Sequence, residues 1–300
     1  MKPQKKAYLF AFAAIACWST IGSAFKLSLR YIDPQGLLFI SSLVACIVLF
    51  TILLVQGKLA LLKQLTFKEV LLSAFLGMLN PFLYYSVLLK AYDLLQAQEA
   101  GTLNYIWPLI LVLLSIPMLH QKISFGSVIA IAISFLGIVM ISSRGQFFEG
   151  ISSVVQTDIT GHTHGVLLAI GSAVLWALYW IFNVKDQREA VSKLFLNFCF
   201  GFLYSLIFMV ASGRVEIPAW QGLAGGFYIG LFEMGITFTL WLYALKYSST
   251  TAKVSNLIYL SPFVSLIIIH FTVGENILTS TVIGLLLIIS GIGLQQYLKR

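Results

Sequence analysis

Charged side chains are scarce in this sequence, and their scarcity sets the class of protein. Only 10% of the residues are Asp, Glu, Lys or Arg, while 59% are hydrophobic. A soluble domain has about a quarter of its residues charged, so this chain has too little polar surface to remain dissolved in water. Apolar runs long enough to cross a bilayer recur along the chain, without the alternating pattern of a β-barrel. The sequence therefore predicts an all-α polytopic membrane protein.

The sequence also lacks the residue patterns of catalysis and of metal or cofactor binding. Its three cysteines, Cys17, Cys46 and Cys199, lie singly in apolar segments, which excludes a disulfide framework or a cysteine-rich metal site. No CxxC, HExxH or GxSxG motif and no phosphate-binding loop occurs. We therefore expect no catalytic residues, no metal and no cofactor, and the sequence argues against an enzyme and an ATP-driven pump.

The basic residues predict an orientation in the membrane rather than a nucleic-acid partner. The net charge is +8, but Lys and Arg lie between the apolar runs instead of forming one patch. They concentrate around both termini and in every second connection, which by the positive-inside rule places these segments in the cytoplasm. The basic start MKPQKK resembles a signal peptide, but the apolar run after it continues to Phe25, which indicates an uncleaved first span.

The apolar segments divide the chain into two similar halves. At about 20 residues per span, they predict ten transmembrane helices. We expect these helices at residues 7–25, 34–56, 69–90, 95–118, 123–142, 164–184, 193–212, 222–245, 250–272 and 279–298. The polar stretch 144–163 predicts a periplasmic loop between a first five-helix half, 1–143, and a second, 164–300.

Self-comparison of the sequence supports the division into halves. A shift of 154 residues places Pro108 on Pro262 and Tyr105 on Tyr259. A shift of 153 places Gly77 on Gly230. Because each half has five spans, the second half enters the membrane from the opposite side. Such an inverted repeat is typical of secondary transporters, and a channel is the weaker alternative.

Away from the span ends, three Asp, Glu, Lys or Arg residues lie within the expected spans, where charges are costly and often functional. Glu99 and Lys253 are equivalent under the 154-residue shift, each nine residues before its proline. At about 1.5 Å per residue they leave the membrane centre by about 14 Å in opposite directions, so we do not expect them to pair. Either each reaches water at one rim of the membrane, or each serves as a gate at one mouth of a path.

Glu233 differs because it lies near the middle of its span. Its equivalent under the 153-residue shift is Asn80, so two polar groups occupy matching places near mid-membrane. Transporters hold their substrates at this depth. Glu233 is suited to bind an ammonium group or to take up a coupling proton. The alternative is a protonated acid held in structural hydrogen bonds.

Prolines and aromatic residues gather at the same depth. Pro108 and Pro262 remove the hydrogen bonds to the carbonyls of Asn104 and Ile258, so they predict either hinges or ordinary kinks at equivalent points. The aromatic residues near these polar groups either pack structurally or line a cavity for an organic solute. They are Trp18, Tyr84, Tyr85, Tyr105, Trp107, Trp176, Tyr179, Trp180, Trp241 and Tyr259.

Two segments carry a resemblance to a known family. AIACWSTIGSAFKLS in the first span and ALKYSSTTAKVSNLIYLSPFVSL near the eighth and ninth resemble the EamA family of the drug/metabolite transporter superfamily, over essentially the whole chain. Within it, EAGTLNYIWPLILVLLS is similar to the YddG-type aromatic amino acid exporters, which have an NYLWP segment in the same helix. The stretch is short, and other exporters of this branch carry other amino acids and metabolites.

The resemblance implies a ten-helix transporter with a central cavity and alternating access. It implies export of small organic solutes, with aromatic amino acids as the leading class, across the bacterial inner membrane. It places Trp18, Asn104, Tyr105, Trp107 and Trp176 at the cavity. With the repeat and the aromatic cluster, the expected substrate-binding residues are Trp18, Asn80, Tyr84, Asn104, Tyr105, Trp107, Trp176, Tyr179, Glu233 and Tyr259.

Two other functions stay open at this point. One is export of other amino acids, metabolites or cationic drugs. The other is a membrane subunit that transports nothing, against which the lack of any long soluble segment argues. The expected partners are a small solute, an amino acid or metabolite, and the lipid bilayer, and the expected state is a monomer.

Overall fold

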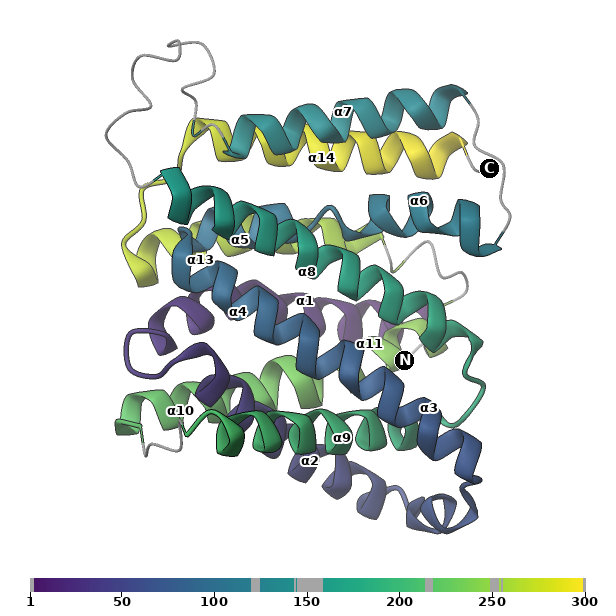
Figure 1. The fold of residues 1–300 in the computed structure, drawn as a ribbon. Helices are drawn as coiled ribbons and strands as arrows, with labels where there is room; N and C mark the ends of the chain where they lie inside the picture. Colours follow the sequence, from purple (N-terminus) through teal and green to yellow (C-terminus); the bar gives the residue numbers. More distant parts are fainter. Residues whose placement is uncertain are drawn as a thin grey trace.

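The computed structural model describes residues 3–119, 125–142, 144, 159–213, 218–248, 254 and 256–298. Throughout this part the chain is helical and contains no strand. The helices run roughly side by side across the molecule (Figure 1). Their shared direction is the arrangement expected of a bundle whose members all cross one layer.

The described part of the first half contains nine helical elements. They are α1 (Pro3–Ser28), α2 (Pro34–Val55), η1 (Leu59–Gln64), α3 (Phe67–Gly77), η2 (Met78–Leu83), α4 (Tyr84–Leu94), α5 (Ala97–Asn104), α6 (Trp107–Leu119) and α7 (Phe125–Ser142). Local sequence fixes several of their ends. Asp33 caps α2 by accepting from the backbone N–H groups of Gln35 and Gly36, and Thr66 forms a capping box with Glu69 at the start of α3.

The described part of the second half contains eight helical elements. They are α8 (Ile159–Lys185), α9 (Ala190–Ala211), α10 (Trp220–Tyr228), η5 (Ile229–Ile236), α11 (Thr237–Tyr247), η6 (Asn256–Leu260), α13 (Ser261–Val273) and α14 (Thr279–Leu298). Extensive packing joins elements of opposite halves, such as α2 with α9 and α7 with α14. The two halves therefore share one core.

Two glycines permit close approach between the halves. A methyl group added to Gly77 would collide with the carbonyl oxygen of Asn197 in α9, and one added to Gly230 would collide with the carbonyl oxygen of Ser41 in α2. These glycines are equivalent in the sequence repeat. Their shared role explains why a side chain is missing at both positions.

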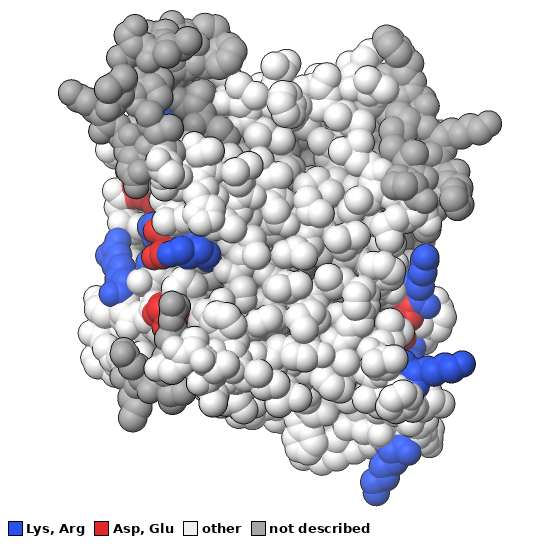
Figure 2. Space-filling view, viewed as in Figure 1, with Lys and Arg blue, Asp and Glu red and all other residues white. Residues whose placement is uncertain are grey.

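The distribution of apolar and charged residues identifies the membrane layer. Within the described part, six helices are long and apolar enough to span a bilayer. They are Pro3–Ser28, Pro34–Val55, Phe67–Leu94, Thr160–Asn183, Ala190–Ala211 and Trp220–Tyr247. Figure 2 shows the charged side chains of one face gathered near two edges, with an uncharged band between them. This pattern is that of a protein crossing a membrane.

The helices end at two opposite edges of the molecule (Figure 1). The terminal edge, at the right in Figure 1, carries the start of α1, the end of α14 and residues 186–189. The opposite edge carries the connections 29–33, 95–96 and 274–278. Both ends of the described chain thus lie at one edge.

The helices depart from the expected spans in several places. Helix α8 begins at Ile159, so residues 159–163 are helical although we expected a loop to 163, and His162 on this added turn contacts Glu99. The spans expected at 69–90 and 222–245 are interrupted by η2 and η5. The start of the span expected at 250–272 lies outside the described residues, and Lys253 lies there too.

Candidate functional site

A central cavity of about 730 Å³ lies between α1, α4, α5, α6, α8, η5, α11 and α13. It extends from Gln98, near the opposite edge, to Lys185 at the end of α8 on the terminal edge. Its volume is in the range of small-molecule sites. The cavity is therefore large enough for an organic solute and crosses much of the membrane layer.

Helix interruptions surround this cavity. Helix α5 ends at Asn104 and α6 begins at Trp107, while η6 ends at Leu260 and α13 begins at Ser261. Pro108 and Pro262 lie in the first turns of the new helices, where a missing N–H is tolerated. The expected bends are thus restarts of the α-helix, which leave Tyr105 and Tyr259 in backbone that is not α-helical at the cavity wall.

Glu233 lies on the third interruption, the π-helical segment η5. It is 8% exposed, and it lines the cavity. One carboxylate oxygen, Oε1, accepts a hydrogen bond of 2.9 Å from the hydroxyl of Tyr85. The other oxygen, Oε2, has no hydrogen-bond partner among the described residues. The site therefore contains a buried carboxylate with unused acceptor capacity.

Aromatic rings form a continuous wall beside Glu233. The ring of Tyr84 lies 4.7 Å from that of Tyr85 and 4.7 Å from that of Trp176, between centroids. Trp176 lies 6.0 Å from Phe238, and Phe238 lies 6.3 Å from Trp18. Such a wall offers stacking and edge contacts to a planar solute.

Neutral polar groups complete the wall. The side-chain oxygen of Asn104 accepts from the Tyr84 hydroxyl at 3.2 Å, and its amide donates to the Ser172 hydroxyl at 2.8 Å. Between α1 and α13, the hydroxyl oxygens of Ser19 and of the lining residue Ser261 lie 3.2 Å apart. These contacts join α4, α5, α8, α1 and α13 around one space.

The structure brings together most of the expected binding residues. Those that line the cavity are Trp18, Tyr84, Asn104, Tyr105, Trp107, Trp176, Glu233 and Tyr259, with both expected hinge prolines, Pro108 and Pro262. The lining also includes residues that sequence reasoning did not propose as binding residues: Tyr92, Gln98, Thr102, Trp180, Lys185, Phe238, Ser261 and Ser265. Helical spacing contained a signal for some of them, because Tyr84, Leu88 and Tyr92 recur every four residues.

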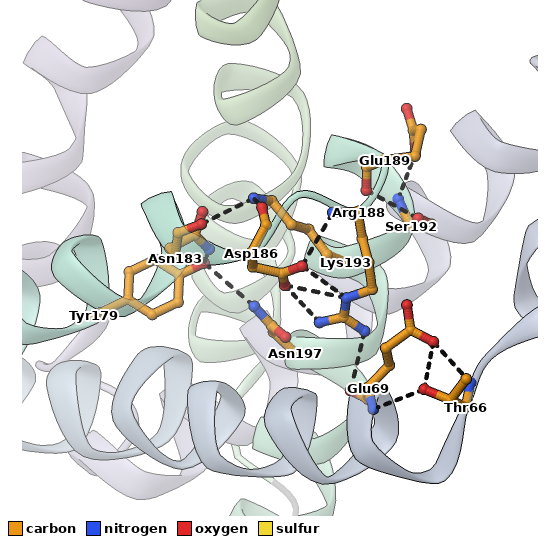
Figure 3. Close-up of polar contacts among 10 residues, drawn as sticks. All are labelled: Thr66, Glu69, Tyr179, Asn183, Asp186, Arg188, Glu189, Ser192, Lys193 and Asn197. Carbon is orange, nitrogen blue, oxygen red and sulfur yellow. Dashed lines mark hydrogen bonds and ion pairs between the residues drawn. The ribbon is translucent and has the colours of Figure 1, made fainter.

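Two expected residues do not line the cavity. The backbone leaves helical geometry at Asn80 (φ −147°, ψ 120°), so its side chain does not occupy the place that a continuous helix would give it, and it is fully buried away from the cavity. Tyr179 accepts a hydrogen bond of 2.9 Å from Asn183 and one of 3.5 Å from Asn197 (Figure 3). Its hydroxyl is thus part of a buried polar cluster next to α9.

A buried ion pair lies near the opposite edge, on α5 next to the lining residue Gln98. Glu99 has a side chain only 1% exposed, and Arg144 donates to its two oxygens at 2.7 Å each. His162 lies 3.3 Å from the same carboxylate. Glu99 therefore does not reach water, contrary to one of the two expectations, because residues that follow α7 and begin α8 cover it.

A second carboxylate fixes the start of α5 at this edge. Glu275 accepts from the backbone N–H groups of Ala97 at 2.7 Å and Gln98 at 3.2 Å. The Gln98 side chain in turn donates to the carbonyl oxygen of Asn276 at 2.7 Å. Helix α5 is thereby tied to the connection between α13 and α14.

The terminal edge has its own polar cluster (Figure 3). Arg188 donates to both oxygens of Asp186, at distances from 2.6 to 3.1 Å, and to the backbone carbonyl of Glu69 at 3.1 Å. Burial alone would raise the pKa of Asp186, but the hydrogen bonds and charge of Arg188 outweigh it and lower that pKa below its usual value. The cluster joins the connection between α8 and α9 to α3.

Comparison with known proteins assigns a family to this architecture. The profile of the EamA-like transporter family matches residues 5–143 and, a second time, residues 163–295. The chain belongs to the EamA-like transporter family. Membership confirms the resemblance to EamA proteins and the expectation of a multi-pass membrane transporter rather than an enzyme.

Relatives of this EamA-like transporter are described as uncharacterized transporters. One from Clostridium kluyveri is 26% identical, over 96% of this chain and 92% of its own length. YvbV of Bacillus subtilis is also 26% identical, over 96% of this chain and 90% of its own length. A crystal structure with 21% identity aligns with 98% of this chain and 97% of its own at a TM-score of 0.66, which shows a shared fold. The relatives' names state no substrate.

Proposed function

We propose that this EamA-like transporter exports small organic solutes, with aromatic amino acids as the leading class, across the bacterial inner membrane. The observation that carries the proposal is the central cavity, which combines an aromatic wall with the buried carboxylate of Glu233. Aromatic rings suit the side chain of the solute, and a carboxylate suits its ammonium group.

The proposed transport mechanism is alternating access between two inverted halves of five spans each, with both termini in the cytoplasm. The double match of the family profile supports the two halves, and the equivalent close contacts of Gly77 and Gly230 support their pseudo-symmetry. Pro108 and Pro262, where helices restart beside the cavity, are the proposed hinges. Glu99 and Lys253 are the proposed gating residues.

The ion pair of Glu99 gives its gating role a physical basis. The pair and the contacts of Glu275 tie α5 to residues that follow α7 and α13. In the proposed opening of the cavity at the opposite edge, α5 parts from these segments and the ion pair breaks. The pair therefore favours a state closed at this edge.

A substrate panel in reconstituted vesicles tests the proposal. Purified protein in proteoliposomes is preloaded with labelled Phe, Tyr or Trp, and efflux is compared with protein-free vesicles and with labelled Ala, Asp and Lys. We expect faster efflux of the aromatic amino acids. If no amino acid moves faster than in protein-free vesicles, the aromatic amino acid proposal fails.

A second candidate function is export of organic cations, which the charge of the cavity favours. Among the described lining residues Glu233 is the one acid, and the cation Lys185 lies at the end of α8 on the terminal edge. Cells that overproduce the transporter would then tolerate cationic drugs better than cells with Glu233→Gln, which growth at graded drug concentrations measures.

A further inference from the structure

We infer that Glu233, with the adjoining faces of Tyr84 and Trp176, forms a subsite for the ammonium group of an aromatic amine. The cavity then selects the amine and makes no charged contact with a carboxylate. The inference rests on the proposed function, since it names the charge class of the solute that the same cavity takes.

The first support is the charge of the cavity wall. Glu233 lines the cavity with its Oε2 oxygen unpartnered within the described part, although the residue is more than nine-tenths buried. A buried carboxylate without a counter-ion is unfavourable, so a cation or proton that reaches it is bound. Among its described residues the lining contains no Arg or His and one Lys, Lys185 at the end of α8, so a solute with an ammonium group can itself supply the positive charge.

The second support is the position of the aromatic faces. Tyr85 donates a hydrogen bond to Glu233, and its ring lies edge-on to that of Tyr84, with an interplanar angle of 70° and 4.7 Å between centroids. The ring of Tyr84 in turn lies 4.7 Å from that of Trp176. A cation within about 6 Å of a ring centroid is attracted to the face of that ring. Because Glu233, Tyr84 and Trp176 line the same cavity, we expect an ammonium group beside Glu233 to meet both a negative charge and these rings, while the apolar body of the solute extends toward Phe238 and Trp18.

The third support is the separation along α8 between Trp176 and Lys185, the one basic residue of the described lining. Lys185 follows Trp176 by nine residues in the continuous helix α8, which corresponds to about 14 Å along the helix. The ammonium and carboxylate of an amino acid are attached to the same carbon, so a solute whose ammonium group lies beside Trp176 also holds its carboxylate near that turn of α8, nine residues before Lys185. Besides Lys185, the described lining offers a carboxylate neutral donors, such as Ser265 and Thr102.

Three ligands with one ring system separate these contributions. Tryptamine carries an ammonium group alone, L-tryptophan carries both charges, and 3-indolepropionate carries a carboxylate alone. Their dissociation constants for the purified full-length protein in detergent are measured by isothermal titration calorimetry. We expect tryptamine to bind about tenfold more tightly than tryptophan, because only the latter desolvates an unpaired carboxylate, and we expect no measurable binding of 3-indolepropionate.

Two variants assign the effect to Glu233. Glu233→Gln keeps the shape of the side chain and removes its charge, so tryptamine should bind at least about tenfold more weakly. Asp93→Asn is the matched control, because Asp93 lies near the opposite edge, pairs with Lys90 and does not line the cavity. If Glu233→Gln does not yield folded protein, the test rests on two other results. One is the order of the three ligand affinities in the unaltered protein, and the other is whether Trp176→Leu abolishes that order.

The outcomes for the inference and for the proposed function are distinct. Equal or tighter binding of tryptophan than of tryptamine overturns the inference, as does tryptamine affinity that Glu233→Gln leaves within about twofold. Either result leaves the proposed export of amino acids standing. Conversely, the expected ligand order without efflux of any solute from vesicles supports the subsite and overturns the proposed function.

Discussion

The ion pair at the opposite edge makes an unequal prediction for its two partners. The Glu99 side chain is 1% exposed, whereas that of Arg144 is 33% exposed. Arg144→Gln leaves a buried carboxylate with His162 and one backbone N–H as its remaining neighbours. Glu99→Gln leaves a guanidinium that can turn toward water. We therefore expect the arginine variant to be the more destabilised of the two.

The structure sets the size of the difference. Breaking a buried ion pair by removing one partner costs about 3–5 kcal/mol when the remaining charge stays buried, which is the case for Arg144→Gln. The remaining arginine of Glu99→Gln is a third exposed, so water screens it and the cost falls to about 1–2 kcal/mol. In the double variant neither charge remains, so it should be more stable than Arg144→Gln alone.

Reversible unfolding in mixed detergent micelles measures these free energies for the original protein, both single variants and the double variant. Lys90→Gln serves as the control, because its pair with Asp93 is largely exposed and should contribute less than about 1 kcal/mol. The reasoning is refuted if Glu99→Gln is destabilised as much as Arg144→Gln, or if both lie within about 0.5 kcal/mol of the original protein, a limit taken from exposed sites.

Three further predictions concern packing, capping and pH. Gly77→Ala and Gly230→Ala should each cost about 1–3 kcal/mol in unfolding experiments, because the added methyl collides with backbone, whereas Gly171→Ala meets nothing closer than 4.0 Å and should not destabilise. Thr66→Ala removes the capping box of α3 and should cost about 1 kcal/mol by the same measurement. The lowered pKa of Asp186 stabilises the fold above the unfolded pKa of about 4, and this stability is lost as the pH falls through the lower folded pKa. Asp186→Asn should therefore flatten the acid side of the stability profile, and an unchanged profile would contradict this assignment.

The sequence predicted what depends on local hydropathy and spacing. The described helices begin and end near the expected spans, because an apolar run of bilayer length specifies a helix without reference to its neighbours. Pro108 and Pro262 correctly marked breaks in the α-helical backbone at the cavity wall. The sequence around them could not show that each proline would begin a new helix instead of bending an existing one, since this depends on how the preceding turn packs.

The parts that the sequence did not predict depend on contacts between distant residues. The partner of Glu99 is Arg144, which the sequence analysis placed only in the polar stretch 144–163, and His162 lies on a helical turn that was expected to be a loop. Asn80 matches Glu233 in the repeat but does not line the cavity, because equivalent positions need not direct equivalent side chains where the backbone is broken. A repeat therefore locates depth in the membrane better than it locates a binding residue.

Efflux of labelled tryptophan from preloaded proteoliposomes, compared between Trp176→Ala and Trp220→Ala, tests most directly that this cavity is the transport path. Trp176 lines the cavity, whereas Trp220 is 73% exposed at the start of α10 and is not part of the lining. The account predicts that Trp176→Ala slows efflux about tenfold or more, by loss of aromatic contact with the solute, while Trp220→Ala exports at the original rate. Equal efflux through the two variants at equal protein content would contradict it.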